Sequence, residues 1–350
     1  MSYDSLALAS SAMHRMLTGL FTVCLLAGEG CTMGIKQTVL VATILFITIA
    51  SPVSAQLKKV RFSVSAASIA EVPFRIAHVK GFYRDEGLDV EVIMIRGAVG
   101  MQALLGGSVD YTSSSGSTIA AAVRGIPVKL VFIASAKPQF DLVVQPQIRR
   151  IQDLRGKVVG ISSRGGAVDL LMQLLLQKNG LAPNKDVTTI VVGAQEETVF
   201  ALRAGRIAAG LFTPPRPLIL QREGFTRLAY SGDYMPTYPS GGIGATDEKI
   251  KTNPAEVLAF VKGSVRGLHF ARQNRGEAMK ILSDYFNIKD HALAEAFFEL
   301  YLSRLPADGG ADEAWMKGAI DFTQKSLGDS GKDISANQVF DFSFVNKAAR

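Results

Sequence analysis

Cysteine is almost absent from this chain, and both copies, Cys24 and Cys31, lie within the first 55 of its 350 residues. If those residues are removed, no thiol remains, which excludes disulfides, thiol catalysis, cysteine-ligated zinc and iron–sulfur clusters. No apolar run reaches the roughly twenty residues that a membrane-spanning helix needs. Because 48% of the residues are hydrophobic and 20% are charged, the composition is typical of a globular protein rather than a disordered or fibrous one.

The N-terminal region has the pattern of a secretory signal peptide. Residues 38–50 (TVLVATILFITIA) form a short apolar core, preceded by Lys36 and followed by the small residues Val53-Ser54-Ala55. This pattern predicts export to the periplasm and cleavage after Ala55, so that residues 1–55 are the signal peptide. A second apolar stretch at 16–27 indicates that translation starts at Met33 and that residues 1–32 are an upstream extension. The alternative is an uncleaved membrane anchor.

Beyond residue 55, strand and helix periodicities alternate twice. The first set predicts strands at 59–65, 88–95, 110–113 and 128–135, and helices at 74–84, 101–105 and 118–124. The second set predicts strands at 142–145, 157–162, 188–192, 208–213 and 226–230, and helices at 167–178, 196–204 and 216–222. Beyond 241–245 the pattern is helical only, at 254–273, 276–286, 291–305 and 312–327, with a short helix near Ala336. The alternation predicts parallel sheets with helices on both faces.

Two β/α sets predict an α/β protein with two lobes. We expect residues 56–141 and 237–350 to form the first lobe and residues 142–236 to form the second. Ligands of open parallel sheets bind beyond the carboxyl ends of the strands. Two such sheets joined by a hinge therefore predict a ligand cleft between the lobes, which closes around its ligand.

Three predicted strand-to-helix junctions are rich in small polar residues. The first runs from Ser65 to Ser68, the second spans 112–118 and the third spans 162–167. The start of a helix carries unpaired N–H donors and a partial positive charge, so it binds carboxylate, sulfonate, nitrate or phosphate groups. Arg164 adds a possible charge-assisted contact. These junctions supply the candidate ligand-binding residues Ser68, Ser114, Ser115, Gly116, Ser117, Ser163, Arg164, Gly165 and Gly166. The alternative for each junction is ordinary helix capping.

Other chemistry-bearing residues give weaker signals. His78, His269 and His291 show no metal-ligand spacing, and Glu196-Glu197 is typical of a helix start. No nucleophile elbow or phosphate-binding loop follows a predicted strand. The net charge of +7 is spread along the chain, without a Lys/Arg cluster interleaved with aromatic residues. The sequence therefore predicts no catalytic residue, no metal, no cofactor and no nucleic-acid partner.

An ordered set of segments resembles a known protein family. The segments are 80–83 (KGFY), 86–90 (EGLDV), 103–110 (ALLGGSVD), 124–129 (RGIPVK) and 153–161 (DLRGKVVGI). Between residues 58 and 245 the chain resembles the NMT1/THI5-like solute-binding proteins, the receptors of ABC importers for nitrate, sulfonates, taurine and related compounds. The resemblance implies a type II periplasmic-binding-protein fold, a small-molecule ligand held at the junctions above, and a permease partner in the inner membrane. We also expect a monomer without enzymatic activity.

One position departs from the family pattern. Where some relatives carry a cleft-facing carboxylate, this chain has Thr213, within the segment Phe212-Thr213-Pro214-Pro215. The resemblance adds Thr213 to the candidate ligand-binding residues, and the lost negative charge favours an anionic or neutral ligand. Two alternatives stay open at this point. One is an enzyme like the pyrimidine synthases of thiamine biosynthesis, and the other is a ligand-sensing module without a transport role.

Overall fold

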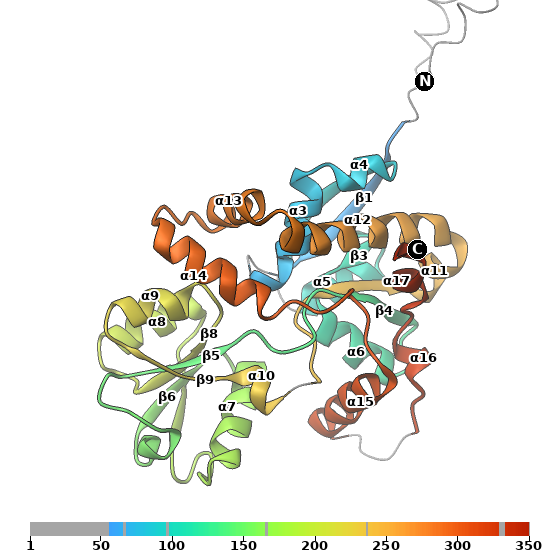
Figure 1. The fold of residues 1–350 in the computed structure, drawn as a ribbon. Helices are drawn as coiled ribbons and strands as arrows, with labels where there is room; N and C mark the ends of the chain where they lie inside the picture. Colours follow the sequence, from blue (N-terminus) through green and yellow to red (C-terminus); the bar gives the residue numbers. More distant parts are fainter. Residues whose placement is uncertain are drawn as a thin grey trace, which may run out of the picture. The chain divides into compact units, whose positions relative to one another are not determined.

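Two five-stranded sheets organise the chain (Figure 1). In the first sheet the strand order is β2-β1-β3-β10-β4, and in the second it is β7-β6-β8-β5-β9. The computed structural model describes residues 56–65, 68–95, 98–164, 167–235, 237–328 and 333–349. All of these residues belong to one compact unit of the chain, Gln56–Arg350.

The first sheet combines N-terminal strands with one strand from later in the chain. Its members are β1 (Lys58–Val64), β2 (Leu88–Met94), β3 (Tyr111–Thr112), β4 (Val128–Ile133) and β10 (Gly242–Thr246). β1 lies parallel to β2 and to β3, whereas β10 lies antiparallel to β3 and to β4. The carboxyl ends of β1 and β3 therefore meet at the same edge of the sheet.

The second sheet is built from the middle of the chain. Its members are β5 (Asp141–Val144), β6 (Val158–Ile161), β7 (Thr188–Val191), β8 (Ala209–Phe212) and β9 (Thr226–Tyr230). β6 is parallel to β7 and β8, but β5 is antiparallel to β8 and β9. The prediction of parallel sheets is therefore wrong for β5 and β10. β5 follows a short passage from the first sheet, and β10 follows a short passage from the second sheet that contains only the four-residue helix α10 (Ser231–Tyr234). Neither passage has the long helical crossover that joins neighbouring parallel strands.

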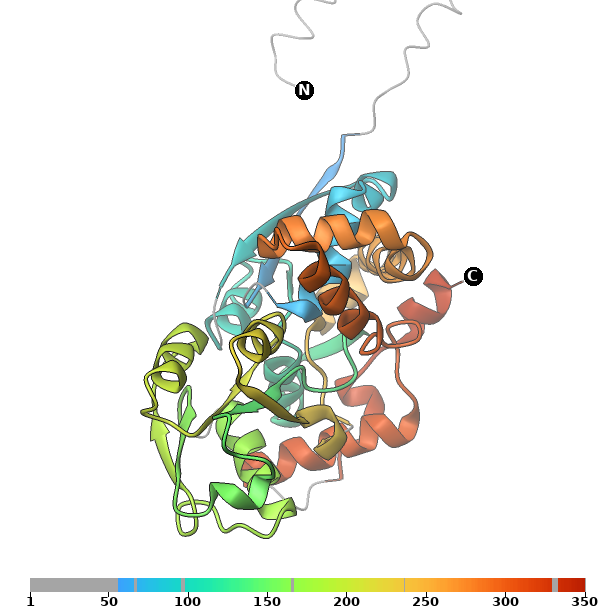
Figure 2. The same ribbon diagram turned by 60° about the vertical axis from the view of Figure 1, so that its left-hand side comes forward.

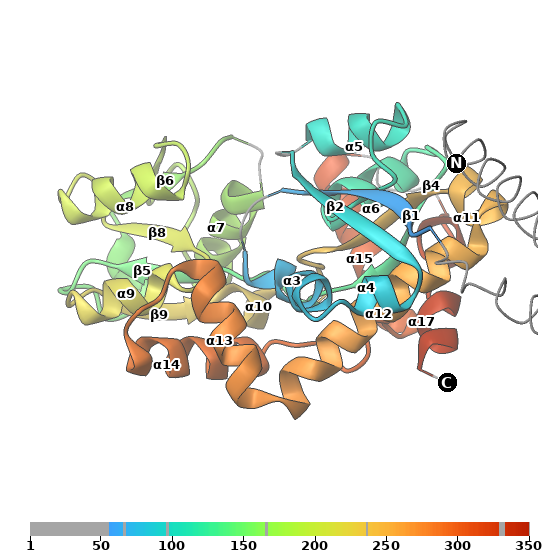
Figure 3. The ribbon, with the colours of Figure 1, turned by 90° about the horizontal axis from the view of Figure 1, so that it is seen from above.

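Helices cover both faces of each sheet (Figures 1 and 3). Those in the β/α part are α3 (Val72–Val79), α4 (Phe82–Asp85), α5 (Ala98–Leu105), α6 (Ser115–Val123), α7 (Ala167–Lys178), α8 (Gln195–Arg203), α9 (Arg216–Arg222) and α10 (Ser231–Tyr234). Short 3-10 helices are η1 (Ile69–Glu71) and η2 (Ile151–Leu154). The alternation along β5 explains the double cover, because Leu142 and Val144 pack with α7 whereas Val143 packs with α8 and α9.

The C-terminal region is helical, as predicted. It contains α11 (Asp247–Thr252), α12 (Pro254–Gln273), α13 (Arg275–Phe286), α14 (His291–Leu302), α15 (Glu313–Leu327), α16 (Ala336–Val339) and α17 (Ser343–Ala348). These helices are orange to red in Figure 2. α12 packs along α3 and α4 beside the first sheet, whereas α14 packs against α13 and against α9 of the second sheet. Phe260 of α12 meets Phe62 of β1 edge-to-face in that core, with 5.1 Å between the ring centroids.

Several predicted boundaries are confirmed, and others are wrong. Helices α7, α9 and α12 have the predicted bounds. The single helix predicted at 74–84 is two helices, because Gly81 adopts a left-handed conformation with φ of 74° between α3 and α4. The helix predicted at 291–305 ends at Leu302. Strand β10 was not predicted at all.

The glycines of β10 are needed for its packing. A Cβ atom on Gly244 would collide with the Thr118 hydroxyl of α6, and one on Gly242 would collide with the Phe132 carbonyl of β4. Glycine is otherwise unfavourable in strands and typical of turns. Strand β10 was therefore missed because its glycines, which the sequence pattern associates with turns, allow α6 and β4 to approach closely.

Two expectations from the sequence concern the ends and boundaries of the chain. The predicted signal peptide, residues 1–55, lies outside the described residues.

The chain passes between the sheets twice, through 134–140 and again through 231–241. The predicted lobe boundaries, 56–141 with 237–350 and 142–236, stay a prediction. Within the part of the chain that the structure describes, no helix combines the length and hydrophobicity of a membrane span.

Candidate functional site

The start of α6 presents unpaired backbone donors. Ser115 N donates to Ser113 O (2.8 Å), and Thr118 N donates to Ser114 O (2.9 Å). Among the described residues, the N–H groups of Gly116 and Ser117 have no acceptor within hydrogen-bond distance. The first turn of α6 contains no acidic residue, so its positive dipole end is not neutralised locally. These two neighbouring donors suit an oxyanion.

The first predicted junction meets the second at this point. Ser65, which follows β1, and Ser114, which follows β3, share a hydrogen bond between their hydroxyl oxygens (2.7 Å). The two strands are parallel neighbours, so their carboxyl ends bring these side chains together. Ser68 precedes η1, and its carbonyl accepts a hydrogen bond from Glu71 N (3.0 Å). The structure therefore places serines from both junctions at one edge of the first sheet.

The second passage between the sheets covers the start of α6. Ser115 Oγ donates to Pro239 O (3.3 Å), and the Tyr238 hydroxyl lies directly against Gly116. Any side chain at position 116 would collide with that hydroxyl, so this glycine is required by the close approach. Burial raises the pKa of Tyr238, so its hydroxyl keeps its proton and can donate. Tyr238 is a candidate site residue that the sequence prediction missed.

A buried acid stands behind the two junctions. Ser113 Oγ donates to Glu71 Oε1 (2.8 Å), and the Glu71 side chain is only 5% exposed. Burial raises the pKa of Glu71 to about 8, although the hydrogen bond from Ser113 opposes the rise. The carboxyl group is therefore mainly uncharged at neutral pH. It does not repel an anion held at the start of α6.

The third junction differs from the second in its charge. The first turn of α7 contains Asp169, which is buried and accepts a hydrogen bond from Gln173 Nε2 (2.9 Å). This carboxylate already compensates the dipole of α7, so an added anion gains less there. Ser163 is exposed, and Gly165 and Gly166 lie outside the described residues.

Arg164 is bound within the second half of the β/α part. Its guanidinium donates to the carbonyl of Thr189 on β7 and to Asn184 Oδ1 (3.3 Å). The β7 strand forms an edge of the second sheet, so Arg164 satisfies a carbonyl on that open edge. The structure does not bring this guanidinium together with Ser114 to Ser117.

Thr213 also has its polar groups engaged. It follows β8 and is buried, and its Oγ1 accepts a hydrogen bond from Gln195 Nε2 (2.9 Å). Its backbone N–H donates to Gln195 Oε1 (2.9 Å). Gln195 is the first residue of α8, so the pair ties the end of β8 to the helix that follows β7. Thr213 positions this edge of the second sheet.

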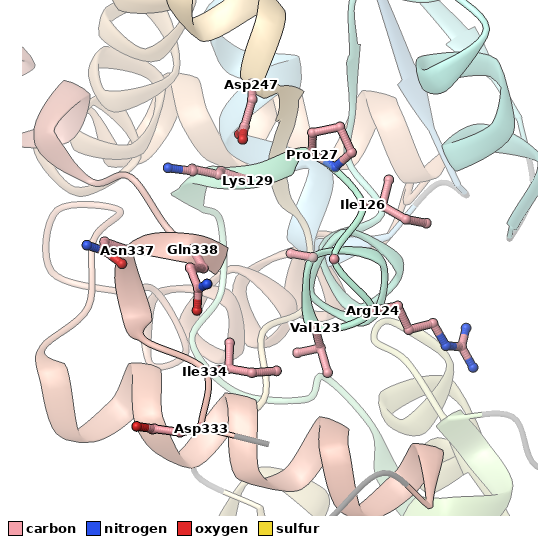
Figure 4. Close-up of a pocket in the computed structure, with 12 residues that line it drawn as sticks. Val123, Arg124, Ile126, Pro127, Lys129, Asp247, Asp333, Ile334, Asn337 and Gln338 are labelled. Carbon is pink, nitrogen blue, oxygen red and sulfur yellow. The ribbon is translucent and has the colours of Figure 1, made fainter. Parts of the chain in front are cut away.

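A separate cavity of about 870 Å³ lies at the opposite end of α6 (Figure 4). Arg124, Lys129, Asp247 and Asp333 give it charges of both signs, and the carboxyl end of α6 forms part of its wall. A helix carboxyl end disfavours anions. The described residues also contain no group of three or more His, Cys, Asp or Glu side chains that could hold a metal ion. The dipole of α6 therefore favours an anion at the start of the helix over one in this cavity.

Comparison with known proteins places these features in a family context. A family model described as NMT1/THI5 like matches residues 70–278. The riboflavin-binding protein RibY of Chloroflexus aurantiacus is 25% identical over 223 residues, which are 61% of this chain and 62% of that protein. The chain thus spans less than two thirds of that relative.

Solved structures show the same fold. The periplasmic aliphatic sulphonate-binding protein SsuA of Escherichia coli is 18% identical, with a TM-score of 0.63 over 80% of this chain and 96% of that one. The periplasmic nitrate-binding protein NrtA of Synechocystis PCC 6803 is 16% identical, with a TM-score of 0.63 over 84% and 89%. The predicted periplasmic-binding-protein fold is confirmed.

Proposed function

Because the chain belongs to the NMT1/THI5-like family, we propose that it is a periplasmic solute-binding protein that delivers a small anion to an ABC importer. The observation that carries this proposal is the start of α6, where Gly116 and Ser117 present N–H donors that have no acceptor among the described residues. The hydroxyls of Ser114 and Tyr238 lie beside them. These donors can surround one oxyanion group. The Glu71 carboxyl group behind them is mainly uncharged at neutral pH, so it does not repel the anion.

The ligand class follows from these donors. A nitrate, sulfonate or carboxylate group accepts hydrogen bonds from Gly116 N and Ser117 N, and from the hydroxyls of Ser114, Ser117 and Tyr238. Ser115 holds the start of α6 to Pro239 in the second passage. The sulphonate-binding and nitrate-binding proteins named above share this fold and support the choice of anion.

The second lobe closes the site in this proposal. The passages 134–140 and 231–241 form the hinge, and Tyr238 belongs to the second of them. Movement of this hinge therefore moves a donor relative to α6. Ser68 and Ser163 line the mouth of the closed cleft. Thr213 positions the edge of the second sheet through its hydrogen bonds to Gln195. Arg164 contributes through its hydrogen bond to the Thr189 carbonyl on β7.

The protein acts without covalent chemistry in this proposal. The signal peptide, residues 1–55, directs it to the periplasm, where the ligand-bound monomer meets the permease. The names of RibY and SsuA, which describe binding proteins, support a binding role over an enzymatic one.

The proposal is tested by calorimetric titration of the purified protein with nitrate, methanesulfonate, taurine and riboflavin. We expect saturable binding of an anion and a loss of about ten- to a hundredfold in affinity for Tyr238→Phe, since one hydrogen bond to a charged ligand contributes about 1.5–3 kcal/mol. The matched control is Tyr234→Phe, whose hydroxyl faces Asn179 instead of α6. Binding of riboflavin alone, unchanged in Tyr238→Phe, would contradict the assignment of an anion.

A further inference from the structure

A second cavity lies beside the first sheet and is distinct from the start of α6. It has a volume of about 320 Å³ and is lined by residues of α3, β1 and β2 and by Tyr285 of α13. Its walls are mainly apolar, formed by Val64, Phe74 and Val90. Small-molecule sites typically measure about 300–1,000 Å³ and combine apolar walls with a few polar groups. The size and lining of this cavity meet both criteria.

Glu71 supplies the polar group of this cavity. Its Oε1 accepts a hydrogen bond from Ser113 Oγ (2.8 Å). Its Oε2 is buried and has no hydrogen-bond partner among the described residues. A buried polar atom without a partner costs about 1–3 kcal/mol, so native proteins rarely retain one without a role. The unpaired oxygen belongs to a side chain that lines the cavity.

The protonation state of Glu71 decides whether Oε2 donates or accepts a hydrogen bond. Because its pKa is raised to about 8 by burial, the carboxyl group is mainly protonated at neutral pH. Ser113 donates to Oε1, which leaves the proton on Oε2 as a donor. A ligand atom that accepts a hydrogen bond therefore completes the group.

The charged groups at the mouth of the cavity do not favour a charged ligand. The Arg75 guanidinium lies over the Tyr285 ring, 5.6 Å from its centroid. Glu91 and His78 complete the mouth beside Val92, which is 45% exposed. The charges of Arg75 and Glu91 cancel, and Glu71 at the inner end is mainly uncharged at neutral pH. The cavity therefore has no net charge that would favour an ionic ligand.

We propose that this cavity binds a small uncharged molecule with an apolar body and one hydrogen-bond acceptor, which accepts from Glu71 Oε2. Ser113 separates this site from the donors of α6, because it bonds to Glu71 on one side and precedes Ser114 on the other. The two sites thus share a wall but differ in ligand class. An uncharged heterocycle fits this second cavity, and an anion fits the start of α6.

Pyridine and benzene are matched probes for this site, because they share a shape and differ in the ring nitrogen that accepts a hydrogen bond. We expect ligand-observed NMR titration at neutral pH to show saturable pyridine binding that is at least about tenfold tighter than benzene binding. Glu71→Gln keeps a donor and retains the preference for pyridine. Glu71→Leu removes the donor and reduces pyridine to the affinity of benzene.

Variants at the mouth test the location independently of Glu71. Val92→Trp fills the mouth from a half-exposed position and should abolish binding of both probes. The matched control, Val99→Trp, lies on α5 outside the cavity, is 58% exposed and should leave binding unchanged. Failure of both probes to bind would overturn the proposal. Pyridine binding that persists in Glu71→Leu and Val92→Trp would also overturn it, because the probe would then occupy another site.

Discussion

Asp141 joins the C-terminal helices to the second sheet, and its replacement by asparagine should be strongly destabilising. Asp141 is the first residue of β5, and its side chain is fully buried. Arg304, which follows α14, donates through Nη2 to both carboxylate oxygens (2.7 and 2.9 Å). Arg227 of β9 donates to Oδ1 (2.9 Å). The Arg304 guanidinium also lies over the Tyr230 ring, 4.0 Å from its centroid.

The magnitude follows from the burial of the partners. Asp141→Asn preserves the size of the side chain but leaves two guanidinium groups beside a neutral amide. The Arg304 side chain is 4% exposed, so water cannot replace the lost carboxylate. Arg227 is 28% exposed and recovers part of its solvation. Removing one partner of a buried ion pair costs about 3–5 kcal/mol, which is a large part of the 5–15 kcal/mol that stabilises a typical protein.

Urea unfolding followed by circular dichroism measures this loss. At a slope of about 3 kcal/mol per molar, a loss of 3 kcal/mol lowers the unfolding midpoint by about 1 M. The matched control is Asp284→Asn, since Asp284 pairs with Lys280 on the surface of α13 and both side chains are more than half exposed. That control should change stability by less than about 0.5 kcal/mol. Equal small losses in the two variants would refute the reasoning from burial.

Two further predictions concern Glu71 and Gly267. Between pH 4.5 and about 8 the folded protein keeps a proton on Glu71 that the unfolded chain has lost, so this residue lowers stability as pH rises. Glu71→Gln should remove that decline, so that above pH 8 the variant is more stable than the unmodified protein by several kcal/mol. Urea midpoints of the two proteins that change with pH in the same way would contradict this. A Cβ on Gly267 of α12 would collide with the Pro73 carbonyl of α3, so Gly267→Ala should cost about 1–3 kcal/mol. Gly276→Ala, which meets open space, should not lower the melting temperature, and equal melting temperatures would count against the packing argument.

Much of the β/α part could be predicted because its patterns are local. The apolar run of β4 and the helical spacing of α7 depend on neighbours within one element, and their positions were predicted within a few residues. β10 was missed because its glycines serve contacts with α6 and β4, which sequence periodicity does not encode. The antiparallel direction of β5 likewise depends on where the chain arrives from the other sheet.

The candidate site could be predicted in part. Clusters of serine and glycine marked the starts of α6 and α7, and Ser65 and Ser114 do meet. Tyr238 was missed because it lies far along the chain from α6, and only the fold brings it to Gly116. Nothing in the sequence indicated that Arg164 turns to the β7 edge, because the direction of a long side chain depends on its neighbours in space.

The most direct measurement is the affinity of Ser117→Pro for methanesulfonate, determined by calorimetric titration beside Ser117→Ala and the unmodified protein. Proline in the first turn of a helix removes an N–H without removing an intrahelical hydrogen bond, so the variant deletes one donor of the proposed anion site. Gly276→Pro, in the first turn of α13, controls for the effect of proline itself. We predict a loss of at least about tenfold for Ser117→Pro and none for Gly276→Pro. Equal affinity in the unmodified protein and in Ser117→Pro would show that the start of α6 does not hold the anion.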